Sequence, residues 1–268
     1  MTADQPPDQP PDQPLLRFNN ERYDPETLGA ILSDFREKGY ARLPDVFERS
    51  TVDAFLKQLQ GVMYHNGLEI KVPDDSPLII WAAQAPRIRQ VLAPALSHSV
   101  AHPLPCLYMS IWAIQPEGAK GGIATWHKDR EPDGMPGKEY HYPKDVFVGM
   151  YFEDMEEKLG PTRIVVGSHR DVSITPYTDA VQENILCRRQ DAYLLDQRAW
   201  HCGTPRTVPG TRTVVVYGYY PVPFHYSFPL RMPGAQEAGW VRASSREDMA
   251  FFGGIWAPPE ELKETPDE

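Results

Sequence analysis

Short runs rich in β-branched and aromatic residues recur past about residue 100, and they constrain the fold more than any other feature of the chain. They lie at residues 107–114, 146–152, 162–166, 192–195 and 212–220. Glycine and proline punctuate the intervals between them. Short strands that alternate with turn residues are typical of antiparallel barrels and sandwiches. We therefore expect an antiparallel β core with its loops at the rims.

The preceding part of the chain has helical periodicity. In the segment Pro25–Lys38, apolar residues recur at helical spacing, with Asp24 placed to cap the helix and Gly39 placed to end it. A short strand is expected at residues 40–44 and a second helix from residue 50 to about residue 63. The predicted fold class is therefore mainly β, with helices that flank a β core.

The chain of 268 residues has the length of one large domain. Residues 1–14 carry a Pro-Pro-Asp-Gln repeat that cannot bury a core, so we expect a disordered tail there. Residues 15–268 are expected to form a single domain. Within it, residues 230–268 are rich in proline and charge and are expected to form a loop-rich extension.

Composition narrows the class of partner. The net charge of -10 is spread along the chain without a basic cluster, which argues against nucleic-acid and anionic-membrane partners and favours a small-molecule substrate. The three cysteines lack the close spacing of disulfide frameworks. No apolar run approaches the roughly 20 residues that span a bilayer, and no signal peptide is evident. We expect a cytoplasmic monomer or small homo-oligomer.

One segment offers ligands for a metal ion. His127 and Asp129 lie two residues apart, so in an extended segment their side chains share one face. These two ligands leave a divalent ion under-coordinated, and His201 is the candidate for a third. The pattern predicts an iron site with two histidines and one carboxylate. The alternatives are that the pair is a chance triplet on a solvated surface and that His201 is a core histidine.

A further candidate is Arg212, which opens an otherwise apolar strand. Its guanidinium is expected at the edge of the barrel interior, where a buried charge needs a partner. A guanidinium pairs with a carboxylate through two parallel hydrogen bonds, which suits a dicarboxylate ligand. The alternative is a salt bridge to an acidic side chain at the rim.

Taken in order, His127, Asp129, His201 and Arg212 resemble the pattern of the phytanoyl-CoA dioxygenase family of Fe(II)/2-oxoglutarate-dependent oxygenases. Two further segments are similar. Residues 39–44 resemble the Gly-Tyr, strand and proline that open the family's fold, and residues 160–170 resemble its Gly-Pro to Gly-Ser-His signature. The resemblance runs from about residue 25 to about residue 222.

The resemblance implies a double-stranded β-helix, the jelly-roll or cupin-like barrel. It implies Fe(II) held by His127, Asp129 and His201, with 2-oxoglutarate and dioxygen as cosubstrates and ascorbate as an aid to activity in vitro. It places Arg212 on the distal carboxylate of 2-oxoglutarate. Tyr108 and Thr162 are further candidates for contacts with the cosubstrate, the alternative for the strand of Tyr108 being inward-facing core.

The implied reaction is oxidation of a C–H bond in a small organic substrate, most simply hydroxylation, with release of succinate and CO2. A role in natural-product biosynthesis is a separate hypothesis that the resemblance does not itself imply. Desaturation, cyclisation and rearrangement use the same residues and remain alternatives. Two rivals are a metal enzyme of the same barrel that does not use 2-oxoglutarate and a non-catalytic ligand-binding barrel. The carboxylate of Asp129 disfavours a halogenase.

The chain departs from the family pattern at two positions. Lys128 stands where glutamine is common, and Arg206 stands where asparagine is common. We expect Lys128 to point away from the metal. His141 and His169 are not expected to be ligands, and the loop at residues 130–143 is expected to cover the mouth of the barrel.

Overall fold

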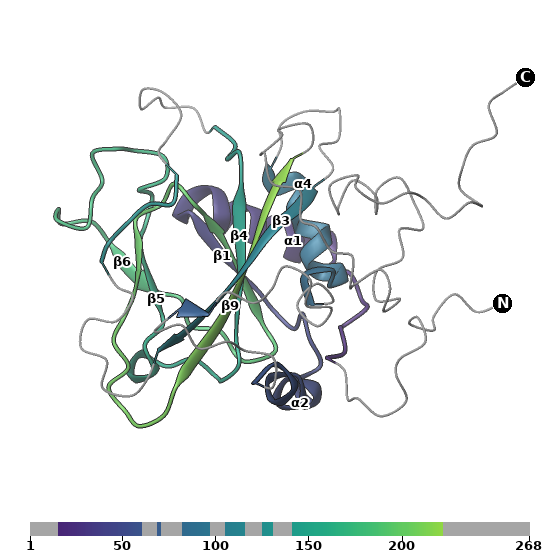
Figure 1. Cartoon of the computed structure of the whole chain (residues 1–268). Helices are drawn as coiled ribbons and strands as arrows, with labels where there is room; N and C mark the ends of the chain where they lie inside the picture. The colour runs from purple at the N-terminus through teal and green to yellow at the C-terminus, as the bar shows by residue number, and fades with distance from the viewer. Residues whose placement is uncertain are drawn as a thin grey trace, which may run out of the picture.

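The computed structural model describes residues 16–60, 69–70, 82–96, 105–115, 125–130 and 141–221 (Figure 1). The predicted tail at residues 1–14 and the predicted extension at residues 230–268 lie outside these ranges, as does most of the predicted mouth loop. Within the described ranges, no helix combines the length and the apolar character needed to cross a membrane.

Helices come first along the described chain and strands dominate afterwards, as expected. The elements are α1 (Pro25–Lys38), β1 (Tyr40–Leu43), α2 (Arg49–Gln60), β2 (Glu69–Ile70), α4 (Pro86–Leu96), β3 (Pro105–Gln115), β4 (Val146–Tyr151), the 3-10 helix η1 (Glu157–Leu159), β5 (Thr162–Val165), β6 (Gln182–Asn184), β7 (Ala192–Asp196), β8 (His201–Gly203) and β9 (Arg212–Pro221).

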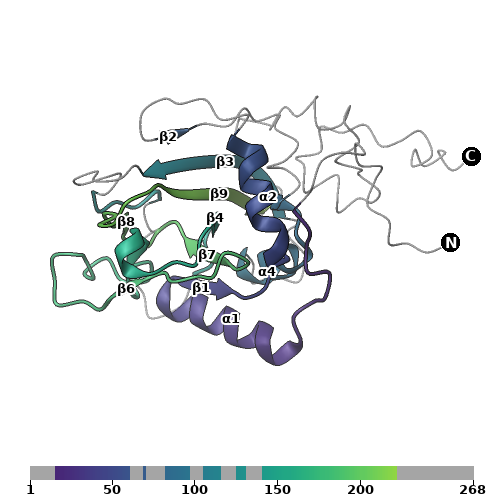
Figure 2. The same cartoon turned by 90° about the horizontal axis from the view of Figure 1, so that it is seen from below.

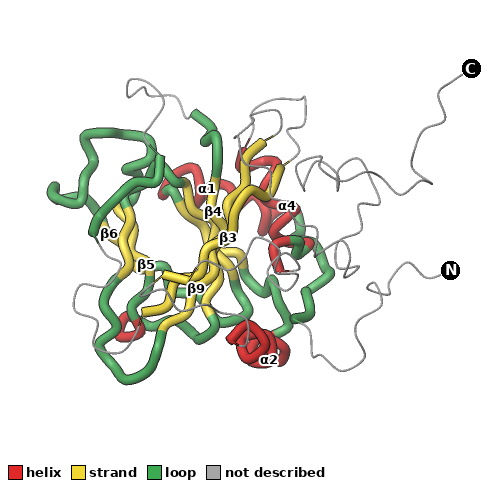
Figure 3. Tube along the Cα trace, in the orientation of Figure 1, coloured by secondary structure: helices red, strands yellow, loops and turns green. Residues whose placement is uncertain are grey.

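The strands form two antiparallel sheets. The larger has the order β1-β7-β4-β9-β3-β2 and the smaller has the order β6-β5-β8. Figure 3 shows the strands gathered in the middle of the molecule, and Figure 2 shows α1 running beside β1 at the outside of the larger sheet. Apolar side chains of both sheets meet between them, among them Tyr151 of β4, Ile164 of β5 and Val214 of β9.

Strand alternation gives the larger sheet two different faces. On β9, Val215 and Tyr217 belong to the core that includes the helices, whereas Val214 belongs to the core between the sheets. Because side chains alternate along a strand, Arg212 shares the inner face with Val214. The same alternation places Tyr193 of β7 in the core between the sheets and its neighbour Leu194 in the core that includes the helices. The inner face is therefore set by register.

Helix α1 shows how local sequence directs this packing. The carboxylate of Asp24 accepts a hydrogen bond from the Thr27 backbone N–H at 2.9 Å, which caps the N-terminus. Gly39 ends the helix with a φ of 88°, in the left-handed region that glycine adopts readily. Ile31 and Phe35 are buried against the sheet. Cap, stop and apolar face all agree with the prediction.

The structure also contains elements that the sequence patterns did not predict. These are α4, with Pro94 in its interior, the short strands β2, β6 and β8, and η1. Helix α2 begins at Arg49, one residue before the predicted start, and the described part of it ends at Gln60. Each of the five strands predicted past about residue 100 is present.

Candidate metal centre

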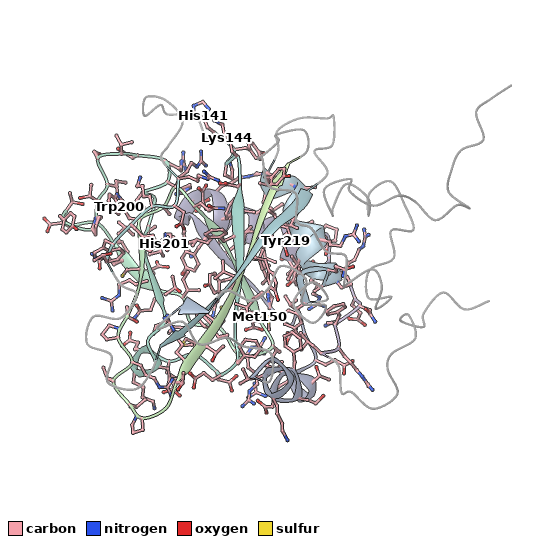
Figure 4. All side chains as sticks on the ribbon, viewed as in Figure 1. His141, Lys144, Met150, Trp200, His201 and Tyr219 are labelled. Carbon is pink, nitrogen blue, oxygen red and sulfur yellow. The ribbon has the colours of Figure 1, made fainter. Side chains whose placement is uncertain are left out.

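The segment at residues 125–130 lies along the turn between β7 and β8. His127 forms an isolated antiparallel bridge with His201, with 3.0 Å from each backbone nitrogen to the other residue's carbonyl oxygen. The backbone N–H groups of Asp129 and Arg130 both donate to the carbonyl of Gln197, at 3.0 and 3.1 Å. These four bonds bring residues 127–129 beside His201, more than 70 positions later in the chain. His201 is labelled in Figure 4.

Three side chains converge as predicted. Nε2 of His201 lies 3.2 Å from one carboxylate oxygen of Asp129, and Nε2 of His127 lies 3.8 Å from the other. The three ligand atoms are all within 4.8 Å of one another, and no other such group of histidine, cysteine and acidic residues occurs among the described residues. The structure therefore assembles the candidate triad His127, Asp129 and His201.

In both imidazoles, a contact between Nδ1 and a backbone carbonyl leaves Nε2 as the nitrogen that faces the triad. Nδ1 of His127 lies 2.8 Å from the carbonyl oxygen of Thr125, and Nδ1 of His201 lies 3.0 Å from that of Ala199. A carbonyl only accepts, so each Nδ1 carries a proton, and Nε2 is in each ring the atom that can bind a metal ion in place of its own proton. Metal-binding histidines are commonly oriented by such backbone bonds.

The donor set fits an octahedral divalent ion. With metal–ligand distances of about 2.1 Å, adjacent ligands on one octahedral face lie roughly 3 Å apart. The separations of 3.2 and 3.8 Å are close to this value. Burial opposes the charged form of Asp129, but the hydrogen bond and charge of His201, with His127 and Arg130, outweigh it and lower the carboxyl pKa. The carboxylate is therefore available as a ligand.

Exposure differs among the three ligands. The side chain of His201 is 10% exposed, whereas those of His127 and Asp129 are 41% and 31% exposed. The two outer ligands are thus accessible from outside while the inner ligand is anchored in the core. A bound ion would have coordination positions open toward that accessible side.

Arg212 is buried on the inner face, with 2% of its surface exposed. Nη1 donates a short hydrogen bond to the carbonyl of Gly160, and Nε has no hydrogen-bond partner among the described residues. A Cβ atom added at Gly203 would come within 3.3 Å of Nη2, so the guanidinium packs against this glycine. No carboxylate in the described part of the chain forms an ion pair with Arg212. The alternative of a rim salt bridge therefore has no support there.

The position of Gly203 relates Arg212 to the metal centre. Gly203 lies two residues after His201 on β8, so the two residues share one face of that strand and lie about 6.6–6.8 Å apart along it. The guanidinium that packs on Gly203 is therefore one step along the strand from the third metal ligand. A short ligand can reach both.

Two tyrosines beside Arg212 were not predicted as site residues. Tyr151 and Tyr193 lie with ring centroids 5.3 Å apart, and both hydroxyls are fully buried near the guanidinium. Burial raises the pKa of Tyr151, an effect that the charge of Arg212 partly offsets. The Tyr151 hydroxyl accepts a hydrogen bond from the Thr162 N–H at 2.9 Å, which leaves its proton to donate. Only cross-strand register places these rings together.

The two other predicted cosubstrate contacts have different outcomes. Thr162 pairs with Gly203 across β5 and β8, which places it next to the Arg212 guanidinium. Tyr108 lies at a register shift between Leu107 and Met109 in β3, and its side chain is outside the described residues. Both roles stay predictions.

A charged network behind the triad was also missed. Arg130 donates from Nε to Asp145 at 2.7 Å, and Asp145 is 2% exposed. Nearby, the fully buried Asp196 accepts two hydrogen bonds from Arg198 side-chain nitrogens, and Arg198 also donates to the carbonyl of His141. Ordinary charge pairs in the sequence give no signal that they will be buried around one turn.

The remaining polar residues have structural contacts. Arg206, at the position where the family often has asparagine, pairs with Glu153 at 2.6 Å and donates to the carbonyls of Val208 and Pro209. Nε2 of His169 lies 3.1 Å from the carbonyl oxygen of Arg36 on α1. Neither His169 nor His141 belongs to the triad.

Comparisons with known proteins bear on the fold. No family model and no curated relative matches the chain. Solved structures do match, at low sequence identity. SnoN, a non-heme α-ketoglutarate-dependent epimerase from nogalamycin biosynthesis, is 17% identical with a TM-score of 0.58, over 74% of this chain and 84% of SnoN.

Two further solved structures agree. HygX from Streptomyces hygroscopicus, with nickel, 2-oxoglutarate and hygromycin B bound, is 20% identical with a TM-score of 0.56, over 73% of this chain and 88% of HygX. SnoK, an α-ketoglutarate-dependent carbocyclase from nogalamycin biosynthesis, is 19% identical with a TM-score of 0.51, over 72% of this chain and 83% of SnoK. The predicted fold class, a jelly-roll barrel with flanking helices, is confirmed.

Proposed function

We propose that this chain is an Fe(II)/2-oxoglutarate-dependent oxygenase of the phytanoyl-CoA dioxygenase type. One observation carries the proposal. Two histidines and one carboxylate form a triad in which each Nε2 is turned toward the carboxylate. Gly203, two residues after His201 on the same strand, packs against a buried guanidinium that has no carboxylate partner among the described residues. Such a triad alone is compatible with many classes of metal enzyme. The buried guanidinium additionally calls for an anionic ligand.

Each residue has a role in this proposal. His127, Asp129 and His201 hold Fe(II), and Arg212 pairs with the distal carboxylate of 2-oxoglutarate, supported by the hydroxyl of Tyr151. Tyr108 and Thr162 remain further candidates for this ligand. When bound, iron with 2-oxoglutarate and dioxygen supplies oxidation of an unactivated C–H bond, coupled to release of succinate and CO2. The protein's own contribution is to orient the ligands and exclude water.

The burial of Arg212 explains why a dicarboxylate fits. A buried guanidinium is costly without an anion, and a carboxylate satisfies it through two parallel hydrogen bonds. His201 and Gly203 lie about 6.6–6.8 Å apart along β8, a distance comparable to the length of a five-carbon diacid. One end of such a molecule can therefore face the metal while the other meets Arg212.

The substrate class rests on weaker support. SnoN and SnoK act in nogalamycin biosynthesis, and HygX was solved with hygromycin B. By analogy, we propose a small organic substrate from natural-product biosynthesis, with hydroxylation as the simplest outcome. Epimerisation and ring closure in the named neighbours keep rearrangement and cyclisation as alternatives. A cytoplasmic monomer or small homo-oligomer without nucleic-acid or membrane partners completes the proposal.

The direct test is turnover of 2-oxoglutarate. Purified protein with Fe(II), ascorbate and labelled 2-oxoglutarate should release labelled CO2. Candidate substrates are then screened, and the true substrate should increase that release. His127→Ala, Asp129→Ala and His201→Ala should each abolish it, because each removes a ligand. Full activity in any of the three variants contradicts the assignment.

The two rival functions predict other results. A metal enzyme of the same barrel that does not use 2-oxoglutarate would bind the metal through the triad yet be indifferent to replacement of Arg212. A non-catalytic barrel would bind a ligand without releasing CO2, and the complete triad argues against it. Measuring metal binding and turnover on the same samples separates these outcomes.

A further inference from the structure

The segment that carries two of the metal ligands has a second, scaffold-facing set of side chains. His127 and Asp129 face the triad, and the alternate residues Lys128 and Arg130 contact other parts of the protein. Alternation in an extended segment means that anchoring residue 128 also decides which way residues 127 and 129 point. The contacts of Lys128 therefore bear on the metal centre.

Lys128 reaches the segment that carries the third ligand. Its Nζ donates to the carbonyl oxygen of Ser168 at 3.0 Å and lies 5.6 Å from the centroid of the Trp200 ring. Trp200 immediately precedes His201. An ammonium over an indole face is attracted by the ring quadrupole, and a charged donor strengthens the bond to a carbonyl. One side chain thus spans both halves of the triad.

The partners of Lys128 are themselves held firmly. Ser168 is fully buried, and its hydroxyl accepts a hydrogen bond from the Trp200 N–H at 2.8 Å while donating to the carbonyl of Val165 at 2.7 Å. The carbonyl oxygen of Trp200 also accepts a hydrogen bond from the Val165 N–H at 2.9 Å. Lys128 is consequently bonded to a rigid corner between β5 and β8. Figure 4 shows Trp200 and His201 at this side of the barrel.

We propose that Lys128 is a positioning residue, which locks the His127–Asp129 segment against the His201 segment so that the three ligands stay at metal-binding distance. This inference rests on the proposed metal centre. Backbone bonds from residues 127, 129 and 130 hold the segment beside the turn between β7 and β8. The side chain of Lys128 adds a contact from the face opposite the triad to the residue that precedes His201.

Metal affinity without cosubstrate tests this role. Mn(II) alone is titrated into metal-free wild-type protein and into Lys128→Met, which keeps the length and apolar stem but removes the charge and the donor. We expect the dissociation constant for Mn(II) to rise about 10- to 100-fold in Lys128→Met, the range found when residues that orient metal ligands are changed. Lys128→Arg, which can still donate and stack, should restore affinity to within about threefold of wild type.

A matched control is Lys158→Met. Lys158 pairs with Glu156 at 2.7 Å on the surface, with more than half of its side chain exposed, and contacts no ligand. It should bind Mn(II) as wild type does. The thermal unfolding midpoint of each metal-free variant is measured alongside, because a purely structural lysine would lower that midpoint and leave the affinity unchanged.

The outcomes are separable. Wild-type affinity in Lys128→Met, with or without a lower unfolding midpoint, overturns the positioning role. If wild type and His201→Ala bind Mn(II) equally, the metal centre itself is wrong. If Lys128→Met does not fold, Trp200→Leu removes the indole beneath the ammonium and should raise the dissociation constant by a smaller factor. An unchanged constant in that variant also overturns the role.

Discussion

The two faces of the larger sheet are built from the same strands and differ in what they bury. The face toward the helices holds apolar side chains such as Val148, Leu194 and Val215, packed with Phe35 of α1. The inner face holds Tyr151, Tyr193 and the guanidinium of Arg212. Successive residues of one strand thus contribute to an apolar core on one face and, on the other, to a core that also buries tyrosines and a guanidinium.

The difference indicates which face is prepared for a ligand. A sealed core gains from apolar burial and dense packing, whereas a buried charge without an anion costs free energy. A chain that folds for stability alone has no reason to retain Arg212 on the inner face. Both faces contribute apolar burial, and under the proposed function the buried guanidinium of Arg212 lowers stability on the inner face but binds the ligand.

Truncation on the helix side should have the largest effect on folding. Phe35 is fully buried between α1 and the sheet, so Phe35→Ala should lower the free energy of unfolding by about 3–5 kcal/mol. Metal affinity, measured where the variant is still folded, should stay at the wild-type value. Denaturant unfolding and a metal titration give the two quantities. A variant that keeps its stability but loses metal affinity would break the division between the faces.

Replacing Arg212 should produce the opposite pattern. Arg212→Met removes the charge at similar volume, so the affinity for 2-oxoglutarate should fall about 10- to 100-fold, equivalent to a charge-assisted bond of about 1.5–3 kcal/mol. The free energy of unfolding of the ligand-free protein should stay level or rise. Arg212→Lys is the matched control, and it should bind weakly because lysine lacks the two-pronged donor. Marked destabilisation with unchanged affinity would make Arg212 a structural residue.

A smaller effect on stability is expected from pH, through His169, which lies where α1 packs against the turn that follows β5. Burial lowers the pKa of His169 below its ordinary value of 6.5, so the folded protein holds it neutral while the unfolded chain protonates it. Stability should fall as pH drops below about 6.5, with a slope of at most about 1.4 kcal/mol per pH unit.

The variant His169→Gln isolates this contribution. Its free energy of unfolding should decline less between about pH 7.5 and about pH 5.5 than that of wild type, because glutamine does not titrate. The difference in slope is the measured quantity, so a constant loss of stability in the variant does not matter. Equal slopes would show that His169 does not contribute to acid sensitivity.

Much of the fold followed from local signals. Asp24 and Gly39 mark the ends of α1, and β-branched runs mark the long strands. The helix α4 contains Pro94, which weakens its helical signal, and strands as short as β8 have too few residues to show alternation. These elements form because neighbours in space supply their hydrogen bonds, which no local pattern records.

The candidate site likewise contains residues that the sequence predicted and residues that it did not. The triad and Arg212 were predicted because their residue types and order resemble a family pattern. Tyr151 and Tyr193 depend on cross-strand register, and the contacts of Lys128 depend on a turn 40 residues later in the chain. Lys128 was expected only to point away from the metal, and its contact with Ser168 and Trp200 agrees with that expectation. What the sequence could not supply was the identity of its partners.

The most direct test of the account is an anaerobic titration of 2-oxoglutarate into the Fe(II)-loaded protein, followed by visible absorption. Bidentate binding of a 2-oxo acid to Fe(II) gives a metal-to-ligand charge-transfer band. We expect this band in wild type, a shift to higher 2-oxoglutarate concentration in Arg212→Met and no band in His201→Ala. A wild-type protein that binds Fe(II) but shows no band, or a His201→Ala variant that shows the full band, would contradict it.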